Sequence, residues 1–323
     1  MLKIGNITLP FPCVLAPLSG VSDLPFRLVN RALGAPLAFT EMIDVRAISQ
    51  RDKRTRKMLS SSPDDRPLGV QLLSNDEKYI LNALDALSEY QYDLLDFNAA
   101  CPTPKVTRKN KGAALLREPR KLGEILKVLV GHAKVPVTVK IRTGWDADSV
   151  NARDVALYAE DAGISALFIH GRTKTQGYSG TVDYRQIKEV KDALKVPVIA
   201  SGDNITAVLI KKMFDETGCD GVAIARGALG NPWIFRETAR FFEDGTVIER
   251  PGMDERIATI KKHLDLTIEH NGEQRGVGIF HKYFIWYTRG LRGTKPLRDK
   301  AFRTGTKRDL LDAIEELRMH DTR

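Results

Sequence analysis

Along most of the chain, apolar runs of strand length alternate with amphipathic stretches whose apolar residues recur at helical spacing. Residues 75–90 and 183–194 are two of these helical stretches. The apolar runs predict strands at residues 13–18, 37–43, 67–73, 92–100, 135–143, 166–172, 196–203 and 221–227. Eight strand-and-helix units in about 240 residues predict a (β/α)8 TIM barrel. A doubly wound open sheet is the alternative, but no GxGxxG follows the first strand.

Helical patterns continue beyond the eighth unit. They follow residues 241–252, which have the composition of an exposed turn and linker. Helices are predicted at residues 253–271, 276–290 and 307–318. We therefore expect two domains, a catalytic barrel over residues 1–245 and a helical domain over residues 246–323.

The charge of the chain suggests what the helical domain binds. Its 323 residues include 50 Lys and Arg against 41 Asp and Glu, a net charge of +9 that favours a polyanionic partner. Between Arg275 and Arg308, ten basic residues face one acid, Asp299. Aromatic residues interleave with these cations, and at helical spacing most of them are expected to lie in a core. The one-sided charge is typical of a nucleic-acid-binding surface.

No apolar segment has the length of a signal peptide or a membrane span, so we expect a cytoplasmic protein. The three cysteines, Cys13, Cys101 and Cys219, lack any CxxC spacing, so neither a disulfide framework nor a metal site is expected. We interpret Cys13 and Cys219 as small buried apolar residues. A monomer is expected.

Polar and small residues stand at nearly every predicted strand end, where TIM barrels hold their active sites. One site across the barrel mouth is therefore expected. The residues at these ends are Ala16, Pro17, Leu18, Glu41, Gln71, Asn98, Cys101, Lys140, Arg142, His170, Arg172, Ser201, Gly202, Asp203, Ala225 and Arg226.

The strand ends favour a flavin phosphate site. Barrels commonly bind a phosphate at the turns after the seventh and eighth strands, where Arg226 would add a positive charge. Tight turns alone would also explain the glycines there. Lys140 could stabilise the anionic N1–C2 edge of a reduced flavin, and Gln71 could bind the pyrimidine edge of the same ring. Lys140 could instead form a Schiff base or pair with Glu41.

The chain resembles the tRNA-dihydrouridine synthases, nearest to the bacterial B-type group, along nearly its whole length. The resemblance rests on long segments in matching order. They are "LAPLSGVSDLPFR" (15–27), "GVQLL" (69–73), "DFNAACPTPKVTRKNKGAALL" (96–116), "VKIRTGW" (139–145), "IHGRTKTQGYSGTVDY" (169–184), "IASGDN" (199–204), "ARGALGNPWIF" (225–235) and "HKYFIWYTRGL" (281–291).

This resemblance implies an FMN-containing barrel and an RNA-binding helical domain, which together reduce the C5–C6 double bond of particular tRNA uridines with NADPH. No metal is implied. Cys101 matches the proton donor, and Asn98 and Lys140 lie near the uracil. Lys105 and Arg172 are further candidates for substrate binding. The positions that match FMN contacts are Ala16, Pro17, Leu18, Gln71, Lys140, His170, Ser201, Gly202, Asp203, Ala225 and Arg226.

The chain departs from the family pattern at three places. The family commonly has Met at position 18, Met-Gly at positions 99 and 100, and Asn at position 201, where this chain has Leu18, Ala99-Ala100 and Ser201. Leu18 and the alanines should preserve packing and the placement of the cysteine. At Ser201 the backbone donors remain, whereas the side-chain contact changes.

Chemistry explains why a cysteine at a strand end precedes a basic loop. Hydride transfer to uracil C6 requires a general acid to protonate C5, and a thiol at an uncharged, partly desolvated strand end can keep its proton for this step. The cations that follow Cys101 are expected to bind phosphates flanking a flipped-out uridine, together with those between Arg46 and Lys57. The cations of the first group are Lys105, Arg108, Lys109 and Lys111.

Two other functions stay open from the sequence. A flavin oxidoreductase acting on a free pyrimidine, similar to the dihydroorotate dehydrogenases, would leave the basic helical domain without a purpose. A non-catalytic RNA-binding protein on a barrel scaffold would leave the residues at the strand ends without a purpose.

Overall fold

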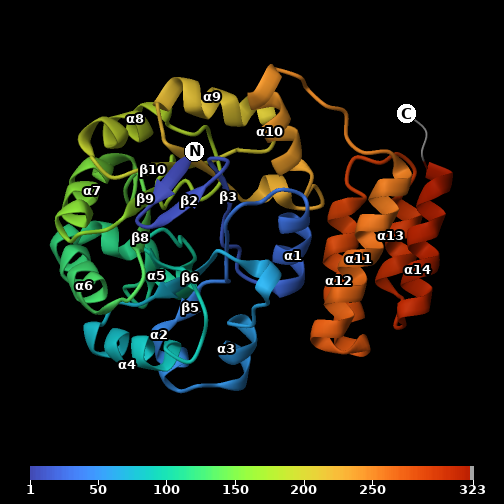
Figure 1. Cartoon of the computed structure of the whole chain (residues 1–323), viewed down its shortest axis with the longest axis horizontal. Helices are drawn as coiled ribbons and strands as arrows, with labels where there is room; N and C mark the ends of the chain where they lie inside the picture. The colour runs from blue at the N-terminus through green and yellow to red at the C-terminus, as the bar shows by residue number, and fades with distance from the viewer. Residues whose placement is uncertain (321–323) are drawn as a thin grey trace.

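The structure, a computed structural model, describes residues 1–320. Its parallel strands close into a barrel, because β4 pairs with both β3 and β6, and helices surround this barrel (Figure 1). The predicted TIM barrel is therefore confirmed. The strands are β3 (Cys13–Leu15), β4 (Ala38–Phe39), β5 (Ile43–Asp44), β6 (Leu68–Leu73), β7 (Leu94–Asn98), β8 (Val137–Arg142), β9 (Ala166–His170), β10 (Val198–Ser201) and β11 (Gly221–Ile224).

The second predicted strand, residues 37–43, is split into β4 and β5. Between β4 and β5, the Thr40 hydroxyl takes the place of a backbone carbonyl and accepts from Gln71 N at 3.3 Å. The backbone N–H of Thr40 still donates to Gly69 O at 2.9 Å. The chain therefore keeps its place in the barrel wall although the ladder is interrupted.

Strand residues alternate between two cores, as strand geometry requires. Val14, Phe39 and Phe168 belong to a cluster inside the barrel, whereas neighbours such as Leu15 and Leu167 belong to the layer shared with the helices. An N-terminal hairpin, β1 (Leu2–Ile4) and β2 (Ile7–Leu9), adds apolar side chains to the inner cluster.

Ten helices follow the strands or connect them. They are α1 (Leu24–Ala32), α2 (Val45–Ser49), α3 (Lys53–Met58), α4 (Glu77–Leu87), α5 (Pro104–Thr107), α6 (Pro119–His132), α7 (Ala152–Asp161), α8 (Tyr184–Ala193), α9 (Ala207–Thr217) and α10 (Ile234–Asp244). Most of them form the outer ring seen in Figure 1.

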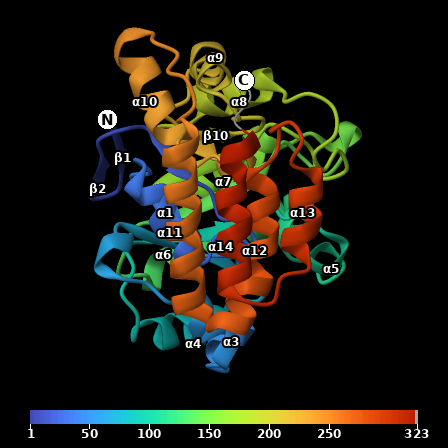
Figure 2. The same cartoon turned by 90° about the vertical axis from the view of Figure 1, so that its right-hand side faces the viewer.

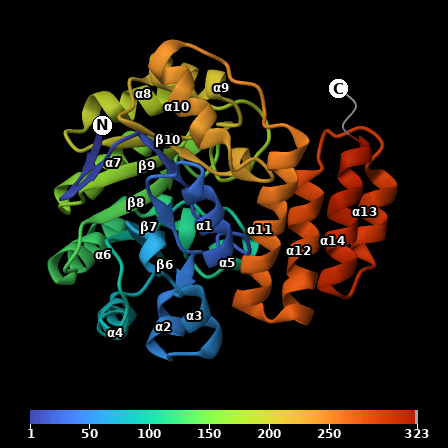
Figure 3. The same cartoon turned by 45° about the vertical axis from the view of Figure 1, so that its right-hand side comes forward.

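The C-terminal helices are α11 (Met253–Asn271), α12 (Glu273–Tyr287), α13 (Lys295–Phe302) and α14 (Lys307–Glu315). They stand beside the barrel next to α1 (Figure 3). The bounds of α11 agree with the prediction, α12 begins three residues before the predicted start at residue 276, and α13 was not predicted. Residues 321–323 of the predicted helical domain lie outside the described residues. The domain boundary after residue 245 stays a prediction.

Aromatic and polar contacts fix the C-terminal helices to the barrel. Tyr283 of α12 stacks on Phe26 of α1 with ring centroids 5.9 Å apart, and its hydroxyl donates to Val21 O at 2.8 Å. Lys282 donates to the carbonyl of Gly20 in the same loop. This loop follows β3 at the barrel mouth, so the C-terminal helices reach the edge of the mouth.

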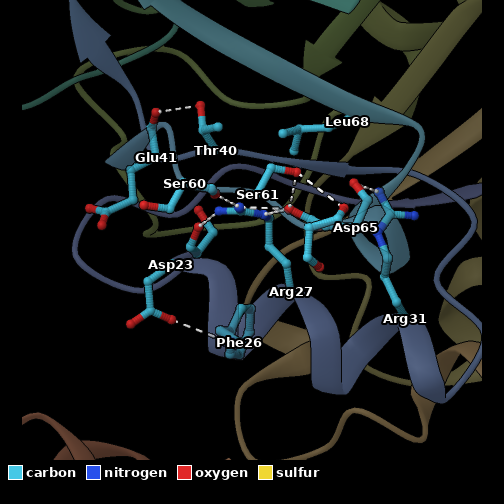
Figure 4. A network of polar contacts seen from close by, with 12 residues as sticks. Asp23, Phe26, Arg27, Arg31, Thr40, Glu41, Ser60, Ser61, Asp65 and Leu68 are labelled. Atoms are coloured by element: carbon cyan, nitrogen blue, oxygen red, sulfur yellow. Dashed lines mark hydrogen bonds and ion pairs between the residues drawn. The ribbon is translucent and has the colours of Figure 1, made fainter. Parts of the chain in front are cut away.

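A buried ion pair between Arg27 and Asp65 lies next to the end of the same loop (Figure 4). Arg27 donates to one oxygen of Asp65 through Nε at 2.9 Å and Nη2 at 2.7 Å, and also to the carbonyls of Ser22 and Ser60. Arg31 donates to the other oxygen of Asp65 at 3.2 Å. Because both charges are fully buried and hydrogen-bonded, removing one partner would leave the other uncompensated.

A buried histidine at the centre of the C-terminal helices should make stability depend on pH. His263 packs against Phe26, Phe280 and Tyr283, and its Nδ1 lies 3.0 Å from the hydroxyl of Tyr287. Burial, with a smaller contribution from the charge of Lys282, lowers the pKa of His263 to about 3. The folded protein therefore holds a neutral ring at pH values where an unfolded histidine is protonated.

We expect the free energy of unfolding to fall as the pH drops below about 6.5, the pKa of an unfolded histidine, with a loss from His263 of about 2 kcal/mol at pH 5. His263→Phe should flatten this decline, whatever constant cost the lost contact with Tyr287 adds. Melting temperatures between pH 5 and 7.5 test this, with exposed His132→Gln as the control. Equal slopes in His263→Phe and the wild type would contradict it.

None of the helices within residues 1–320 combines the length and apolar character that crossing a membrane requires.

Candidate active site

One cavity opens at the carboxyl ends of the barrel strands and collects most of the predicted site residues. Ala16 lies beneath it and is fully buried, Lys105 is exposed on α5, and Arg172 is buried behind the cavity wall. The predicted residues that line the cavity are Pro17, Leu18, Gln71, Asn98, Cys101, Lys140, His170, Ser201, Gly202, Asp203, Ala225 and Arg226.

A line of amide hydrogen bonds leads to Cys101. Asn98 ends β7 opposite Lys140 of β8, and its Nδ2 donates to Gln71 Oε1 at 2.8 Å. Its Oδ1 accepts the backbone N–H groups of Ala100 at 3.0 Å and Cys101 at 2.8 Å. The half-buried thiol of Cys101 is therefore held at the strand end by its own backbone, with its sulfur 3.5 Å from the Thr103 hydroxyl.

Two basic side chains of the cavity have strongly lowered pKa values. Burial lowers the pKa of Lys140 to about 8, although the negative charge of Asp96 opposes this. Its ammonium group has no ion-pair or hydrogen-bond partner among residues 1–320, and Glu41, the predicted alternative partner, accepts from Gly20 N instead. Burial and then the charge of Arg142 lower the pKa of His170 to about 2, so the imidazole is neutral throughout the physiological range.

The turns after β10 and β11 approach each other closely. A Cβ atom on Gly227 would lie 2.2 Å from Asn204 O, and Gly202 has a φ of +134° that favours glycine. Gly227 lies in the 3-10 turn η4 (Arg226–Ala228). In the part of the chain that the structure describes, the backbone N–H groups of Gly202 and Gly227 donate to no protein group. Free N–H groups on two adjoining turns form an anion-binding surface.

Asp203 joins two arginines at this surface. Its carboxylate accepts from Arg172 at 2.5 and 3.1 Å and from Arg226 at 2.8 Å. Arg172 also donates to the carbonyls of Ser179 and Gly180, so its guanidinium is committed to holding the loop after β9. Arg226 is half exposed and lines the cavity.

Arg142 and Tyr178 both line the cavity. Arg142 was predicted at a strand end but without a role, whereas Tyr178 was not predicted as a site residue. Buried Arg142 donates to Ala100 O and Gly177 O, both at 2.8 Å, and so connects the Cys101 segment to the loop after β9. Tyr178 is 58% exposed, and its ring lies 4.7 Å from the Arg226 guanidinium and 6.1 Å from the His170 ring. The signal for Tyr178 was an aromatic residue between two glycines in a loop at a strand end.

Some of the cations predicted to bind phosphates are paired within the protein. Lys111 is buried and bonds Asp44 at 2.6 Å, so it fixes the loop after β7 instead of facing solvent. Arg51 bonds Glu89 at 2.7 Å, and Arg46 lies over the ring of Tyr79. The exposed cations of this group without a carboxylate partner within residues 1–320 are Lys53, Arg54, Arg56, Lys105, Arg108 and Lys109.

In the basic segment from Arg275 to Arg308, too, some side chains are buried or paired within the protein and others are exposed. Its aromatics Phe280, Tyr283, Phe284 and Tyr287 are buried in the core, as predicted, whereas Phe302 is 64% exposed. Lys300 and Lys307 pair with acids. The exposed cations of the segment that lack a carboxylate partner within residues 1–320 are Arg275, Arg289, Arg292, Lys295, Arg303 and Arg308.

A closed parallel barrel with one polar cavity at the ends of its strands defines a TIM-barrel enzyme. The chain belongs to the dihydrouridine synthase family, because the family model described as "Dihydrouridine synthase (Dus)" matches residues 14–320. It is 39% identical over 300 residues to tRNA-dihydrouridine synthase B of Pseudomonas aeruginosa, covering 92% of this chain and 90% of that protein. Its identity to tRNA-dihydrouridine synthase B of Pasteurella multocida is 35%, over 97% and 95% of the two chains. The predicted resemblance is confirmed.

Solved structures share the fold at much lower identity. Morphinone reductase is similar over 79% of this chain and 91% of its own, with a TM-score of 0.54 and 13% identity. An old yellow enzyme homologue from Zymomonas mobilis is similar over 77% and 93% of the two chains, with a TM-score of 0.52 and 14% identity. Residues 1–320 hold no cluster of three or more His, Cys, Asp or Glu side chains that could bind a metal ion.

Proposed function

We propose that the protein reduces particular uridines of tRNA to 5,6-dihydrouridine, with FMN as cofactor and NADPH as electron donor. Family membership and relatives named tRNA-dihydrouridine synthase B support the reaction and the substrate. The observation that carries the proposal is that one cavity combines an anion-binding surface beside Arg226 with the thiol of Cys101.

The cavity residues fit FMN. The free N–H groups of Gly202 and Gly227, together with Arg226, would bind a single phosphate, which is what the mononucleotide requires. Lys140 would supply a positive charge to the ring, and Gln71 keeps one N–H free after its bonds to Asp96 and Asn98. When bound, reduced FMN supplies the hydride that goes to C6 of the uracil.

Cys101 would deliver the proton to C5 of the uracil, the thiol S–H bond breaking as the C5–H bond forms. Its sulfur must then recover a proton from solvent before the next turnover. Asn98 fixes the backbone from which the thiol projects, and Arg142 holds Ala100 beside it. The neutral imidazole of His170 is a poor proton donor because it carries no acidic proton at physiological pH.

The tRNA would lie across the barrel mouth and the C-terminal helices. The helix α13 lies on the same side of the molecule as α5, which follows the Cys101 strand (Figure 2). Exposed Arg292, Lys295 and Arg303 lie in or beside α13, and exposed Lys105 and Arg108 lie in or beside α5. The helical domain, predicted at residues 246–323, would therefore bind RNA phosphates on the face from which the uridine enters the cavity.

We expect the purified protein to release FMN, and not FAD, on denaturation, because the cavity offers one phosphate site. Arg226→Ala should raise the dissociation constant for FMN about 10- to 100-fold, the worth of a hydrogen bond to a charged group. Arg240→Ala is the matched control, since Arg240 is a similarly exposed, acid-paired arginine on α10. FMN affinity measured by flavin fluorescence, with melting temperature as the folding check, decides this. Release of FAD, or of no flavin, would contradict the proposal.

A further inference from the structure

Asp96 is a buried carboxylate that the proposed reaction leaves without a role. It sits in the middle of β7, 1% exposed, with its side chain inside the barrel beneath the cavity. The strand register places Gln71 of β6 and Thr138 of β8 directly beside it. Its carboxylate accepts from Gln71 Nε2 at 2.6 Å and from the Thr138 hydroxyl at 2.7 Å.

The charged group acting on Asp96 is Lys140, which stands two residues beyond Thr138 on the same strand and lines the cavity. The rest of the barrel interior is apolar and includes Val14, Phe39 and Phe168. A carboxylate in such surroundings is costly to bury, so its position directly beneath the polar cavity calls for an explanation beyond packing.

We propose that Asp96 is a positioning residue, whose ionised carboxylate fixes the orientation of the Gln71 and Asn98 side-chain amides and supports the charge of Lys140. An ionised carboxylate can only accept hydrogen bonds, so Gln71 must present its NH2 group to Asp96. Gln71 Oε1 then faces Asn98 Nδ2, and Asn98 Oδ1 faces the backbone N–H of Cys101.

The chain of amides is constrained at both ends. The N–H groups of Ala100 and Cys101 require an acceptor, and Asp96 requires donors, so only one orientation of the two amides satisfies every contact. This orientation decides which N–H groups Gln71 and Asn98 have left for ligands in the cavity. Asp96 thus acts on the cofactor, the substrate and the Cys101 backbone without touching them.

The ionisation of Asp96 makes this role testable. Burial raises its pKa to about 6, against the hydrogen bonds from Gln71 and Thr138 and the charge of Lys140. The carboxylate is therefore ionised at pH 7 to 8 and gains a proton below about pH 6. A protonated carboxyl no longer needs a donor from Gln71, so the constraint at the Asp96 end of the chain is lost, while the N–H groups of Ala100 and Cys101 still hold Asn98 Oδ1.

This inference rests on the proposed function, and its first test compares FMN affinity of Asp96→Asn and wild type between pH 5 and 8. Asn has nearly the same shape but no charge, so the variant should bind FMN about tenfold more weakly at pH 7 to 8, the worth of one charge-assisted hydrogen bond. The ratio of dissociation constants should approach one below pH 6, where wild-type Asp96 is itself neutral. The ionisation of the FMN phosphate is common to both proteins and cancels in the ratio.

A matched variant distinguishes the effect of Asp96 on the chain of amides from any effect of its packing. Thr138→Val removes the other hydrogen bond to Asp96 without touching Gln71. Because that bond lowers the pKa of Asp96, this variant should move the pH at which FMN affinity changes upward. A ratio of dissociation constants that stays constant from pH 5 to 8 overturns the link from Asp96 to Gln71 and Lys140.

A second readout needs no flavin. Asp96→Leu leaves Gln71 without its acceptor, which frees the Gln71 amide to turn away and weakens the hydrogen bond from Asn98 to Gln71 Oε1. Asn98 then holds the Cys101 backbone less firmly, so Cys101 should be alkylated by iodoacetamide about fivefold faster, the worth of one hydrogen bond. Mass spectrometry separates Cys101 from Cys13 and Cys219, which are buried. Thr138→Val should leave the rate unchanged. If the wild type retains no flavin, the proposed function fails while this assay still decides on Asp96, and an unchanged rate in Asp96→Leu overturns its link to Cys101.

Discussion

Cys101→Ala is expected to slow the reoxidation of the reduced flavin by tRNA by about 10²- to 10⁴-fold, the usual effect of removing a positioned general acid. NADPH-driven reduction of the flavin should be nearly unchanged, because that half-reaction needs no proton at C5 of uracil. Stopped-flow measurements of flavin absorbance separate the two halves. Cys101→Ser should retain a little activity, since a hydroxyl fills similar space but is a weaker acid than a thiol.

Binding of tRNA must be measured for the same variants. The exposed cations of the loop, Lys105, Arg108 and Lys109, are untouched by these substitutions, so affinity should hold. A Cys101→Ala enzyme that reduces tRNA at the wild-type rate would make the thiol a structural group only. The proton would then have to come from water, because His170 remains neutral at physiological pH.

The affinity for tRNA is expected to fall steeply with salt. If the six exposed cations of the C-terminal segment without acidic partners each contact a phosphate, log affinity should fall against log salt with a slope of about −4. Between 50 and 200 mM salt this slope means a loss of roughly 250-fold in affinity. Acid-paired Lys300 and Lys307 are left out of this count because their partners, Glu316 and Asp265, already neutralise them.

Neutralising four of these cations to Gln should reduce the slope to about −1.4, so that the same change in salt weakens binding only about sevenfold. The positions are Arg289, Arg292, Lys295 and Arg303. The control carries the same charge change on α8 and α9 of the barrel, at Arg185, Lys188, Lys211 and Lys212. If the control lowers the slope as much as the test variant does, the C-terminal helices are not the RNA-binding surface.

The strand ends could be predicted because strands buried on both faces appear in the sequence as short apolar runs between helical stretches. Once the strands are placed, the barrel brings Gln71, Asn98, Lys140 and His170 to one cavity, although they are far apart in the sequence. Cys101 was among the predicted strand-end residues, and the resemblance to the family added its role as the proton donor. The roles of these residues stay predictions until they are measured.

Features missed from the sequence depend on tertiary contacts or on short signals. Helix α13 is only eight residues long and begins at Lys295-Pro296, which gives too few turns for a periodic pattern. The hairpin β1–β2 is short, and its turn at Gly5 was not interpreted, although Gly5 has a φ of +58°. The pairing of Lys111 with Asp44 joins residues 67 positions apart, so no local pattern predicts that this cation is buried.

The hydrogen-bonded chain of amides from Asp96 to Cys101 could not be predicted from the pattern of apolar and polar residues either. An acidic residue in an apolar strand indicates a buried carboxyl group that needs hydrogen-bond donors. Only the register of β6, β7 and β8 shows that these donors are Gln71 and Thr138. Likewise, the hydrogen bonds from Arg172 to the Asp203 carboxylate depend on how the loop after β9 folds. Sequence alone indicated the kind of chemistry, and folding determined which polar groups stay free for it.

Turnover on unmodified tRNA tests the central claim most directly. The flavin-loaded protein should be incubated with NADPH and either an unmodified tRNA transcript, free uridine or orotate, with dihydropyrimidine products measured by mass spectrometry. The account predicts dihydrouridine at defined positions of the tRNA and no comparable turnover of the free pyrimidines, because the basic C-terminal helices recognise only the polyanion. Efficient reduction of a free pyrimidine, with the tRNA left unchanged, would contradict it.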